Sequence, residues 1–467
     1  AIDMVNRPEY LETFYAALKL GCVPVNVNYR YGPEEIHYLL EDSGARLLVH
    51  EPEFGPPVRM AVQRVPAPWR PHTLETGHEY EAAIANGTVA AGRDPAGDDL
   101  IFLYTGGTTG MPKGVMWRND DLYVALWEMA RPNTDPPDPI AGVRAGKRVA
   151  TALPACPLMH GTGLFIALST LSGGGTVVLI DRPGLEPAVV WDAVERDEVQ
   201  VLTIVGDAFA RPLLAALDDE PNRWDLGSLR AITSSGVTWS PETKRGLLAH
   251  LPNVTLLDSL GASEGLMTRN ETTAGADIRP ARFAVNDRLK VISPEGKEVE
   301  PGSDEKGLLA VGGRIPLGYH NDPEKTDATF KEIDGVRYSL PGDWASVDAD
   351  GTIRLLGRGS ACINTGGEKV YPEEIELVLR SHVGVFDCVV VGVPDERLGE
   401  MVVALIHPRA DAVFDESELR NYCRSRTAGY KTPKRMLAVE SLQRSPSGKA
   451  DYAVLRELAA RLVAEGG

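Results

Sequence analysis

A loop rich in glycine and threonine follows a short apolar run, and this segment constrains the 467-residue chain more than any other. Residues 100–103 are apolar, which is typical of a buried strand, and residues 104–115 read YTGGTTGMPKGV. Glycines let backbone N–H groups approach an anion closely, and threonine hydroxyls add further donors. Lys113 adds a cation. The sequence therefore predicts a buried strand followed by a phosphate-binding loop.

This loop does not follow the Walker A pattern, which requires Gly-Lys followed by Ser or Thr. Here Lys113 is followed by Gly114, which has no hydroxyl. The competing interpretation is a plain glycine-rich turn that binds nothing. Twelve residues with this combination of glycines, hydroxyls and a cation favour phosphate binding.

Length and composition set the broad class of the protein. A chain of 467 residues is too long to fold around a single hydrophobic core, so we expect two or more domains. The hydrophobic fraction of 43% and the charged fraction of 24% are typical of globular proteins. A net charge of −18 argues against a nucleic-acid partner, because binding a phosphate backbone requires a basic face.

The cysteines and the lengths of the apolar runs indicate the cellular compartment in which the protein is expected. The five cysteines are scattered without zinc-site spacing, so we expect free thiols in a reducing, cytoplasmic setting. No apolar run is long enough to span a bilayer. The sequence does not decide whether the protein contacts a membrane surface, and it does not give the oligomeric state. The chain does not begin with Met, so we expect the native protein to begin further upstream.

Alternating helical and strand-like patterns predict an α/β fold with parallel-type sheets. Residues 8–20 and 34–40 have helical spacing, and residues 45–50, 175–180 and 201–205 are strand-like. Residues 284–356 change to short strands with tight turns, which predicts a small β-barrel. The predicted domains are residues 1–359 and a smaller α+β unit over residues 360–467. The proline-rich stretches 56–71 and 132–139 are expected to be surface loops.

Residues 261–265 (GASEG) admit two interpretations. They satisfy G-x-S-x-G, the strand–turn–helix elbow of serine hydrolases, with Ser263 as nucleophile and a histidine such as His320, His382 or His407 as its partner. The second interpretation comes from a resemblance to a segment of the adenylate-forming enzymes, which implies that Glu264 supplies a hard oxygen ligand for Mg²⁺. The five residues alone do not decide between these two.

The phosphate loop resembles that of the adenylate-forming enzymes, the superfamily of acyl-CoA synthetases, luciferases and peptide-synthetase adenylation domains. This chain carries Gly106 where a serine is usual. The resemblance implies that ATP is bound by the loop residues Thr105, Gly106, Gly107, Thr108, Thr109, Gly110 and Lys113. It also implies that Thr108 and Glu264 are catalytic and hold Mg²⁺, that Ser263 binds the nucleotide and that Gly261 borders the substrate, which favours the second interpretation of residues 261–265.

Further segments match the family in order over nearly the whole chain. The resemblance implies that Gly236 borders the adenine, and that Asp343 accepts hydrogen bonds from both ribose hydroxyls. It implies that Arg358 contacts ribose or phosphate. Ser360 stands at the interdomain hinge, where the family usually has Asp or Lys. The resemblance also implies that His160 borders the acyl channel, either as a gate for the carboxylate or as a packing histidine.

The C-terminal unit carries the remaining matches. Gly366 and Gly367 would line the channel for the pantetheine of coenzyme A, because glycines leave room for a thin ligand. Pro372 with the following acids predicts the N-terminus of a solvated acidic helix. Lys449, in a loop near the end of the chain, is implied to enter the active site as the catalytic lysine.

These segments are most similar to those of actinobacterial fatty-acid and sterol side-chain CoA ligases. The resemblance implies that ATP and a carboxylic acid give an acyl-adenylate, and that coenzyme A attacks it after the small domain turns about Ser360. Asp207 is either a polar anchor in a wide acyl pocket or the capped start of a helix. The alternatives are a serine hydrolase using Ser263, an acyl-AMP ligase without the CoA step and a non-catalytic nucleotide-binding module.

Overall fold

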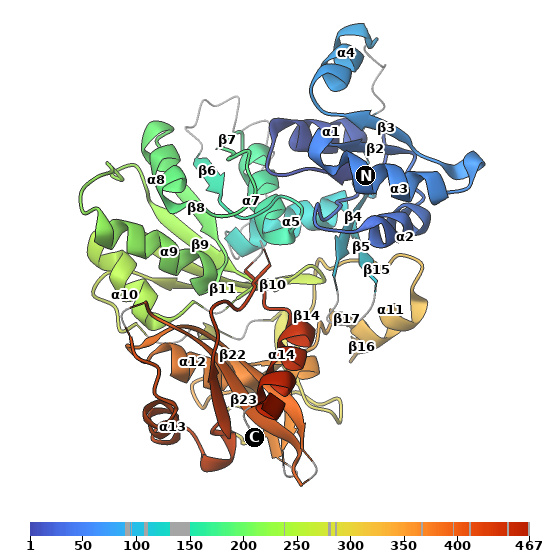
Figure 1. Ribbon diagram of the computed structural model, residues 1–467. Helices are drawn as coiled ribbons and strands as arrows, with labels where there is room; N and C mark the ends of the chain where they lie inside the picture. Colours follow the sequence, from blue (N-terminus) through green and yellow to red (C-terminus); the bar gives the residue numbers. More distant parts are fainter. Residues whose placement is uncertain are drawn as a thin grey trace.

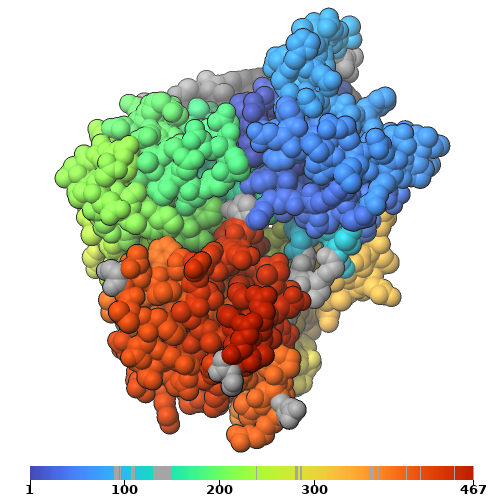
Figure 2. Space-filling view, in the orientation of Figure 1, coloured from blue at the N-terminus to red at the C-terminus, as the bar shows by residue number. Residues whose placement is uncertain are grey.

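A computed structural model gives the structure of the protein. It describes residues 1–88, 94, 96–106, 111–130, 150–237, 239–278, 282–284, 287–365, 368–395, 397–410, 412–445 and 448–465. The chain forms a large N-terminal part, blue to yellow in Figure 1, and a smaller C-terminal part, orange to red. Figure 2 shows the two parts packed against each other, with the small part below the large one.

The central layer of the large part is a six-stranded sheet with strand order β11-β10-β9-β8-β6-β7. All neighbouring strands are parallel except β10 and β11, as the alternating pattern predicts. The strands are β6 (Thr151–Pro154), β7 (Thr176–Val177), β8 (Val201–Ile204), β9 (Ala231–Ser235), β10 (Thr255–Ala262) and β11 (Gly265–Thr272). The helices that accompany them are α7 (Gly161–Ser172), α8 (Pro187–Arg196), α9 (Gly206–Asp219) and α10 (Pro241–His250).

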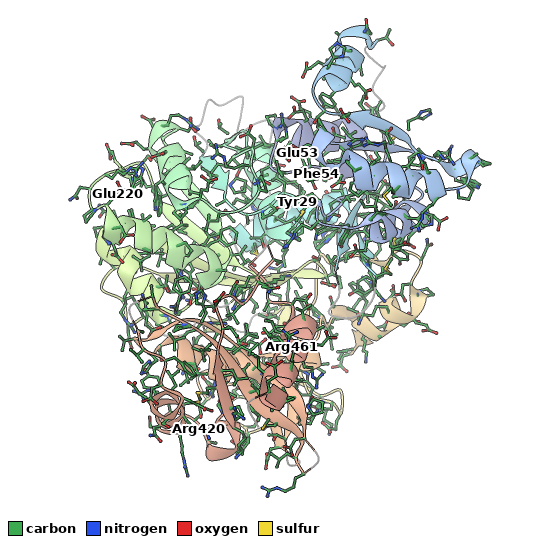
Figure 3. The ribbon with its side chains drawn as sticks, viewed as in Figure 1. Tyr29, Glu53, Phe54, Glu220, Arg420 and Arg461 are labelled. Atoms are coloured by element: carbon green, nitrogen blue, oxygen red, sulfur yellow. The ribbon has the colours of Figure 1, made fainter. Side chains whose placement is uncertain are left out.

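The N-terminal region adds a three-stranded parallel sheet with order β1-β2-β3. Its elements are β1 (Ile2–Asp3), α1 (Pro8–Lys19), α2 (Pro33–Ser43), β2 (Leu47–His50), α3 (Gly55–Arg64), β3 (His72–Glu75) and α4 (His78–Asn86). Tyr29 stacks on Phe54 of the 3₁₀ turn Pro52–Phe54, with ring centroids 5.4 Å apart (Figure 3).

The prediction of a loop over residues 56–71 is wrong for residues 56–64, because they belong to helix α3. Its prolines stand in the first turn, where no backbone donor is needed. The predicted loop 132–139 lies outside the described residues.

A small three-stranded sheet carries the glycine-rich segment. Strand β4 (Leu100–Thr105) pairs antiparallel with β5 (Lys113–Arg118), and β5 pairs with β15 (Gly318–Tyr319). Helix α5 (Asn119–Ala130) follows β5 directly. Trp117 on β5 is completely buried in the hydrophobic core that this sheet shares with β11 and the following strands. The sheet therefore fixes where the glycine-rich loop begins and ends.

The strand-rich region forms a seven-stranded antiparallel sheet. Its pairing in the described residues runs from β12 to β16 as an open sheet, where the sequence predicts a small barrel. Residues 348–351 form the predicted tight turn, with the N–H of Gly351 donating to the carbonyl of Asp348 at 2.9 Å. The elements are β12 (Phe283–Ala284), β13 (Leu289–Ile292), β14 (Gly307–Val311), α11 (Pro323–Thr329), β16 (Phe330–Ile333), β17 (Val336–Ser339), β18 (Asp343–Val347) and β19 (Thr352–Arg358).

The C-terminal part begins after a 3₁₀ turn, η3 (Gly359–Ala361), and has its own five-stranded sheet and hydrophobic cores. Its strands are β20 (Ile363–Thr365), β21 (Glu368–Val370), β22 (Val385–Asp395), β23 (Gly399–Pro408) and β24 (Arg435–Ala438). Its helices are α12 (Pro372–Arg380), α13 (Glu416–Arg424) and α14 (Tyr452–Glu465). Among the described residues, none of the helices has the length and apolar character needed to cross a membrane.

Candidate active site between the two parts

The glycine-rich loop connects two strands of a hairpin. Thr105 at the end of β4 faces Lys113 at the start of β5. Gly107, Thr108, Thr109 and Gly110 lie outside the described residues. A Cβ on Gly106 would find only the hydroxyl of Tyr31 within 4 Å, at 3.8 Å, so the backbone there has space for a side chain.

Lys113 forms an ion pair with Asp322, which also caps the start of helix α11. The hydrogen bond from this lysine is the main cause of the lowered pKa of Asp322. The pair places an ammonium group at the exit of the loop, where a phosphate could replace the carboxylate as its partner. Asp322 was not predicted from the sequence, because its contact with Lys113 joins residues that are 209 positions apart.

Glu264 and the glycine-rich segment are brought together by two side chains of the small sheet. Ser263 and Glu264 form the two-residue turn between β10 and β11, in which Ala262 faces Gly265. The indole N–H of Trp117 donates to the carbonyl of Ser263 at 2.8 Å. The hydroxyl of Tyr319 donates to Oε1 of Glu264 at 2.7 Å. Trp117 and Tyr319 thus position the carboxylate next to the loop hairpin.

The geometry of this turn corrects the hydrolase interpretation. A nucleophile elbow joins a strand to a helix, whereas Ser263 lies between two antiparallel strands. The candidate histidines are engaged elsewhere. Nε2 of His320 lies 3.0 Å from the carbonyl of Asp42, His382 pairs with Glu418, and His407 packs on Phe386.

The predicted ribose-binding and hinge residues follow one another along one hairpin. Asp343 at the start of β18 is the cross-strand partner of Arg358 at the end of β19. Ser360 comes two residues later in η3, and the N–H of Gly359 donates to the carbonyl of Gly342 at 3.0 Å. Gly366 and Gly367 lie outside the described residues, between the paired strands β20 and β21. The run from residue 344 to 358 contains only this hairpin.

Lys449 reaches the large part of the molecule. Its loop turns at Gly448, whose φ is +72°, and a Cβ there would lie 3.0 Å from Cβ of Ala208 and 3.2 Å from Cγ1 of Val205. A Cβ on Gly236 would lie 3.8 Å from Cε of Lys449. The lysine side chain therefore lies beside the turn after β9, and Figure 1 shows the red segment before α14 rising toward the central sheet.

His160 lies in the same region, directly before helix α7. Burial, together with the smaller effect of the positive charge of Lys449, lowers the pKa of His160 to about 4. The imidazole is therefore neutral near pH 7. His160, Gly236 and Lys449 come from three distant segments and meet here, which brings together three of the predicted site residues.

Asp207 is buried in the first turn of α9, and both of its carboxylate oxygens accept hydrogen bonds within the large part. Its Oδ1 accepts the N–H of Ser240 at 3.0 Å, and its Oδ2 accepts Nε of Arg211 at 3.3 Å. The helix-cap reading is wrong, because α9 follows Val205 and has no side-chain cap. Gly261, the other predicted substrate residue, lies at a bulge in β10. The roles of Asp207 and Gly261 in acyl recognition stay predictions.

The acidic helix also differs from its prediction. Helix α12 begins at Pro372 as expected, but Glu376 is buried and pairs with Arg380 instead of facing solvent. The described residues contain no cluster of three or more His, Cys, Asp or Glu side chains that could hold a metal alone. Such a cluster is not required for Mg²⁺, which commonly uses one or two protein oxygens and takes the rest from substrate phosphates and water. The carboxylate of Glu264 is a ligand of this kind, whereas Thr108 lies outside the described residues.

A β-hairpin with a glycine-rich loop, an acidic turn beside it and a lysine from the C-terminal part form the arrangement expected of an enzyme that activates its substrate with a nucleotide. Residues 1–320 match the AMP-binding enzyme family, and residues 374–449 match the AMP-binding enzyme C-terminal domain. The chain therefore belongs to the AMP-binding enzymes, the adenylate-forming superfamily.

Two relatives are similar over almost the whole chain. The 3-oxocholest-4-en-26-oate–CoA ligase of Rhodococcus rhodochrous is 37% identical, over 96% of this chain and 84% of the relative. The medium/long-chain-fatty-acid–CoA/3-oxocholest-4-en-26-oate–CoA ligase of Mycobacterium marinum is 38% identical, over 97% of this chain and 86% of the relative.

Solved structures agree on the fold. ATP-bound MatB from Rhodopseudomonas palustris superposes with a TM-score of 0.81 at 27% identity, over 99% of this chain and 88% of that chain. Apo MatB superposes with a TM-score of 0.69 at 26% identity, over the same shares of the two chains.

Proposed function

We propose that this chain is an acyl-CoA ligase that activates a carboxylic acid with ATP and transfers the acyl group to coenzyme A. The observation that carries the proposal is the place of Lys449. A lysine from the C-terminal part lies beside Gly236 and His160 of the large part, close to the turn after β9. A cation delivered there suits a reaction in which negative charge develops on a phosphate.

The first half-reaction forms the acyl-adenylate. A carboxylate oxygen attacks the α-phosphorus of ATP, the bond to the β-phosphate oxygen breaks, and pyrophosphate leaves. Lys449 stabilises the charge on the α-phosphate, and the loop around Lys113 holds the departing phosphates. Mg²⁺ held by Glu264 and Thr108 would neutralise phosphate charge. ATP-bound MatB superposes better than apo MatB, which supports an orientation suited to this step.

The second half-reaction requires the small part to turn about Ser360. Rotation withdraws Lys449 and brings the segment around Gly366 and Gly367 toward the adenylate. The thiol sulfur of coenzyme A attacks the acyl carbonyl, AMP leaves, and the thiol proton is released. The short hairpin over residues 344–358 leaves no insertion that would restrain this rotation, which favours a CoA ligase over an acyl-AMP ligase.

A fatty or sterol side-chain acid is the proposed substrate class. The names of the two relatives support this class, since both include 3-oxocholest-4-en-26-oate. The five free cysteines, three of them buried, support a reducing cytoplasmic setting. A comparison of kcat/KM for a steroid side-chain acid, octanoate and palmitate tests the class, and a preference for octanoate would contradict the sterol assignment.

The half-reactions can be measured separately, which gives the decisive test of the ligase. Lys449→Ala should lower carboxylate-dependent ATP–pyrophosphate exchange by roughly 10²–10³-fold, the cost of one preorganised charge. Thioester formation from synthetic acyl-adenylate and coenzyme A should be largely spared. Lys331→Ala, which removes an exposed lysine on β16, is the control and should change neither step. Equal loss of both steps would reject the role of Lys449, and ester hydrolysis that depends on Ser263 would reject the ligase.

A further inference from the structure

One face of helix α9 contacts the C-terminal part at two consecutive turns. Ala208 lies against Gly448 in the loop that carries Lys449. Arg211 is three residues further along the helix and therefore lies on the same face. Arg211 is only 7% exposed and is paired with Asp207, whose side chain is 6% exposed. The helix thus presents a buried arginine beside the docking place of the lysine loop.

Arg211 donates to two backbone carbonyls of the C-terminal part. Its Nη2 lies 3.2 Å from the carbonyl of Arg380, and its Nη1 lies 3.4 Å from the carbonyl of Val385. Arg380 is the last residue of α12, where carbonyls lack partners within the helix and carry its negative partial charge. A guanidinium at this end satisfies such a carbonyl and interacts favourably with the helix dipole.

The contacts continue inside the C-terminal part as far as the Lys449 loop. The side chain of Arg380 donates to Asp387 at 3.1 Å, and Asp387 also accepts Nε of Arg444 at 2.6 Å. Nη1 of Arg444 donates to the carbonyl of Gly448 at 3.1 Å. Burial opposes the charge of Arg380, but its acidic neighbours Glu376 and Asp387 keep the pKa of Arg380 well above its usual value. The end of α12 and the lysine loop therefore belong to one charged network.

We propose that Arg211, oriented by Asp207, is a positioning residue that latches the C-terminal part in the orientation with Lys449 inserted. This inference rests on the proposed two-step function. Asp207 and Arg211 belong to the large part, whereas both acceptor carbonyls belong to the part that turns about Ser360. The two bonds to these carbonyls therefore form in one orientation only. After rotation the guanidinium can be solvated, so release leaves no unpaired buried charge.

The proposal predicts an asymmetric effect on the two half-reactions. Arg211→Met keeps the aliphatic stem and removes both donors. Pyrophosphate exchange should fall at least about 100-fold, as expected for two bonds from a charged donor, while thioester formation from acyl-adenylate should be unchanged or faster. In the double variant Asp207→Asn/Arg211→Met, which leaves no unpaired carboxylate, pyrophosphate exchange should fall by a similar factor. Arg420→Met is the matched control, because Arg420 pairs with Glu416 on its own helix α13, away from the junction (Figure 3).

A readout without substrates separates this proposal from the proposed function. Loss of the latch should move Lys449 away from His160, so the pKa of His160 measured by NMR titration should rise in Arg211→Met and stay unchanged in Arg420→Met. This rise is expected whatever acid the enzyme activates. An unchanged pKa of His160, or an equal loss of both half-reactions, would overturn the latch. Absence of carboxylate-dependent exchange in the parent protein would instead overturn the ligase.

Discussion

At the scale of single residues, His160 links protonation to the orientation of the two parts. Its pKa is about 4 in the folded protein, against 6.5 for an ordinary histidine, because it is buried and lies close to Lys449. A pKa that is lowered on folding means that the neutral form is favoured in the native state. The stabilisation is full above pH 6.5 and is lost as the pH falls from 6.5 toward 4.

Denaturant unfolding of the parent and of His160→Gln at two pH values checks this linkage. Between pH 7.5 and pH 5 the free energy of unfolding of the parent should fall by about 2 kcal/mol more than that of the variant, since unfolded histidine binds a proton in this window and the buried one does not. His78→Gln, which replaces a histidine exposed at the start of α4, is the control and should follow the parent. Parallel pH profiles for the parent and His160→Gln would contradict the lowered pKa.

Single residues differ in how far their roles could be predicted from the sequence. The sequence around Lys449 predicts a place in the active site, because its neighbours and its position near the end match a known pattern. The structure places its side chain beside Gly236, and its catalytic role stays a prediction. Arg211 was not predicted, because Asp207 and Arg211 four residues apart resemble an ordinary surface pair on a helix. Only the packing of the C-terminal part on α9 shows that this pair is buried. Asp322 and Tyr319 were missed for the same reason, since their partners are distant in sequence.

At the scale of elements, docking of the Lys449 loop on α9 depends on a glycine that has no room for a side chain. Gly448 has φ +72°, and a Cβ there would press on Ala208 and Val205. Gly335, in the turn between β16 and β17, has a similar φ of +77° but nothing within 4 Å of its Cβ position. A side chain at either glycine would meet the same backbone strain, but only a side chain at Gly448 would also press on neighbouring atoms.

Alanine at these two positions separates strain from docking. Both variants should lose about 1 kcal/mol of stability in chemical denaturation, because a Cβ disfavours positive φ. Gly448→Ala should also lower pyrophosphate exchange at least tenfold while sparing thioester formation, and Gly335→Ala should leave both steps intact. Equal activities in the two variants would show that the lysine loop docks without needing this close contact.

Elements were predicted with uneven success, and the errors have physical causes. The parallel sheet and helices α1, α2 and α12 follow from apolar periodicity and proline position. Helix α3 was missed because prolines 56 and 57 suggest a loop, although prolines fit the first turn of a helix. The elbow reading of residues 261–265 failed because the pattern does not reveal that β11 turns back on β10.

At the scale of the whole molecule, the proposed rotation of the C-terminal part would occur at the short 3₁₀ turn η3, which contains Ser360. The turn joins the last strand of the antiparallel sheet, β19, to the first strand of the small sheet, β20. The proposed alternation between the half-reactions would require a change of φ and ψ in this connection. The 3₁₀ conformation has φ between −50° and −70°, which is the value that proline enforces.

Ser360→Pro should therefore trap the orientation with Lys449 inserted instead of an arbitrary one. Pyrophosphate exchange should be retained within a few-fold, while thioester formation from acyl-adenylate and overall turnover should fall by at least tenfold, because φ can no longer change. Ser360→Ala keeps backbone freedom and should match the parent in both steps. Combining Ser360→Pro with Arg211→Met should restore little of the CoA step, because releasing the latch does not free the hinge. Full turnover in Ser360→Pro would place the rotation at another residue.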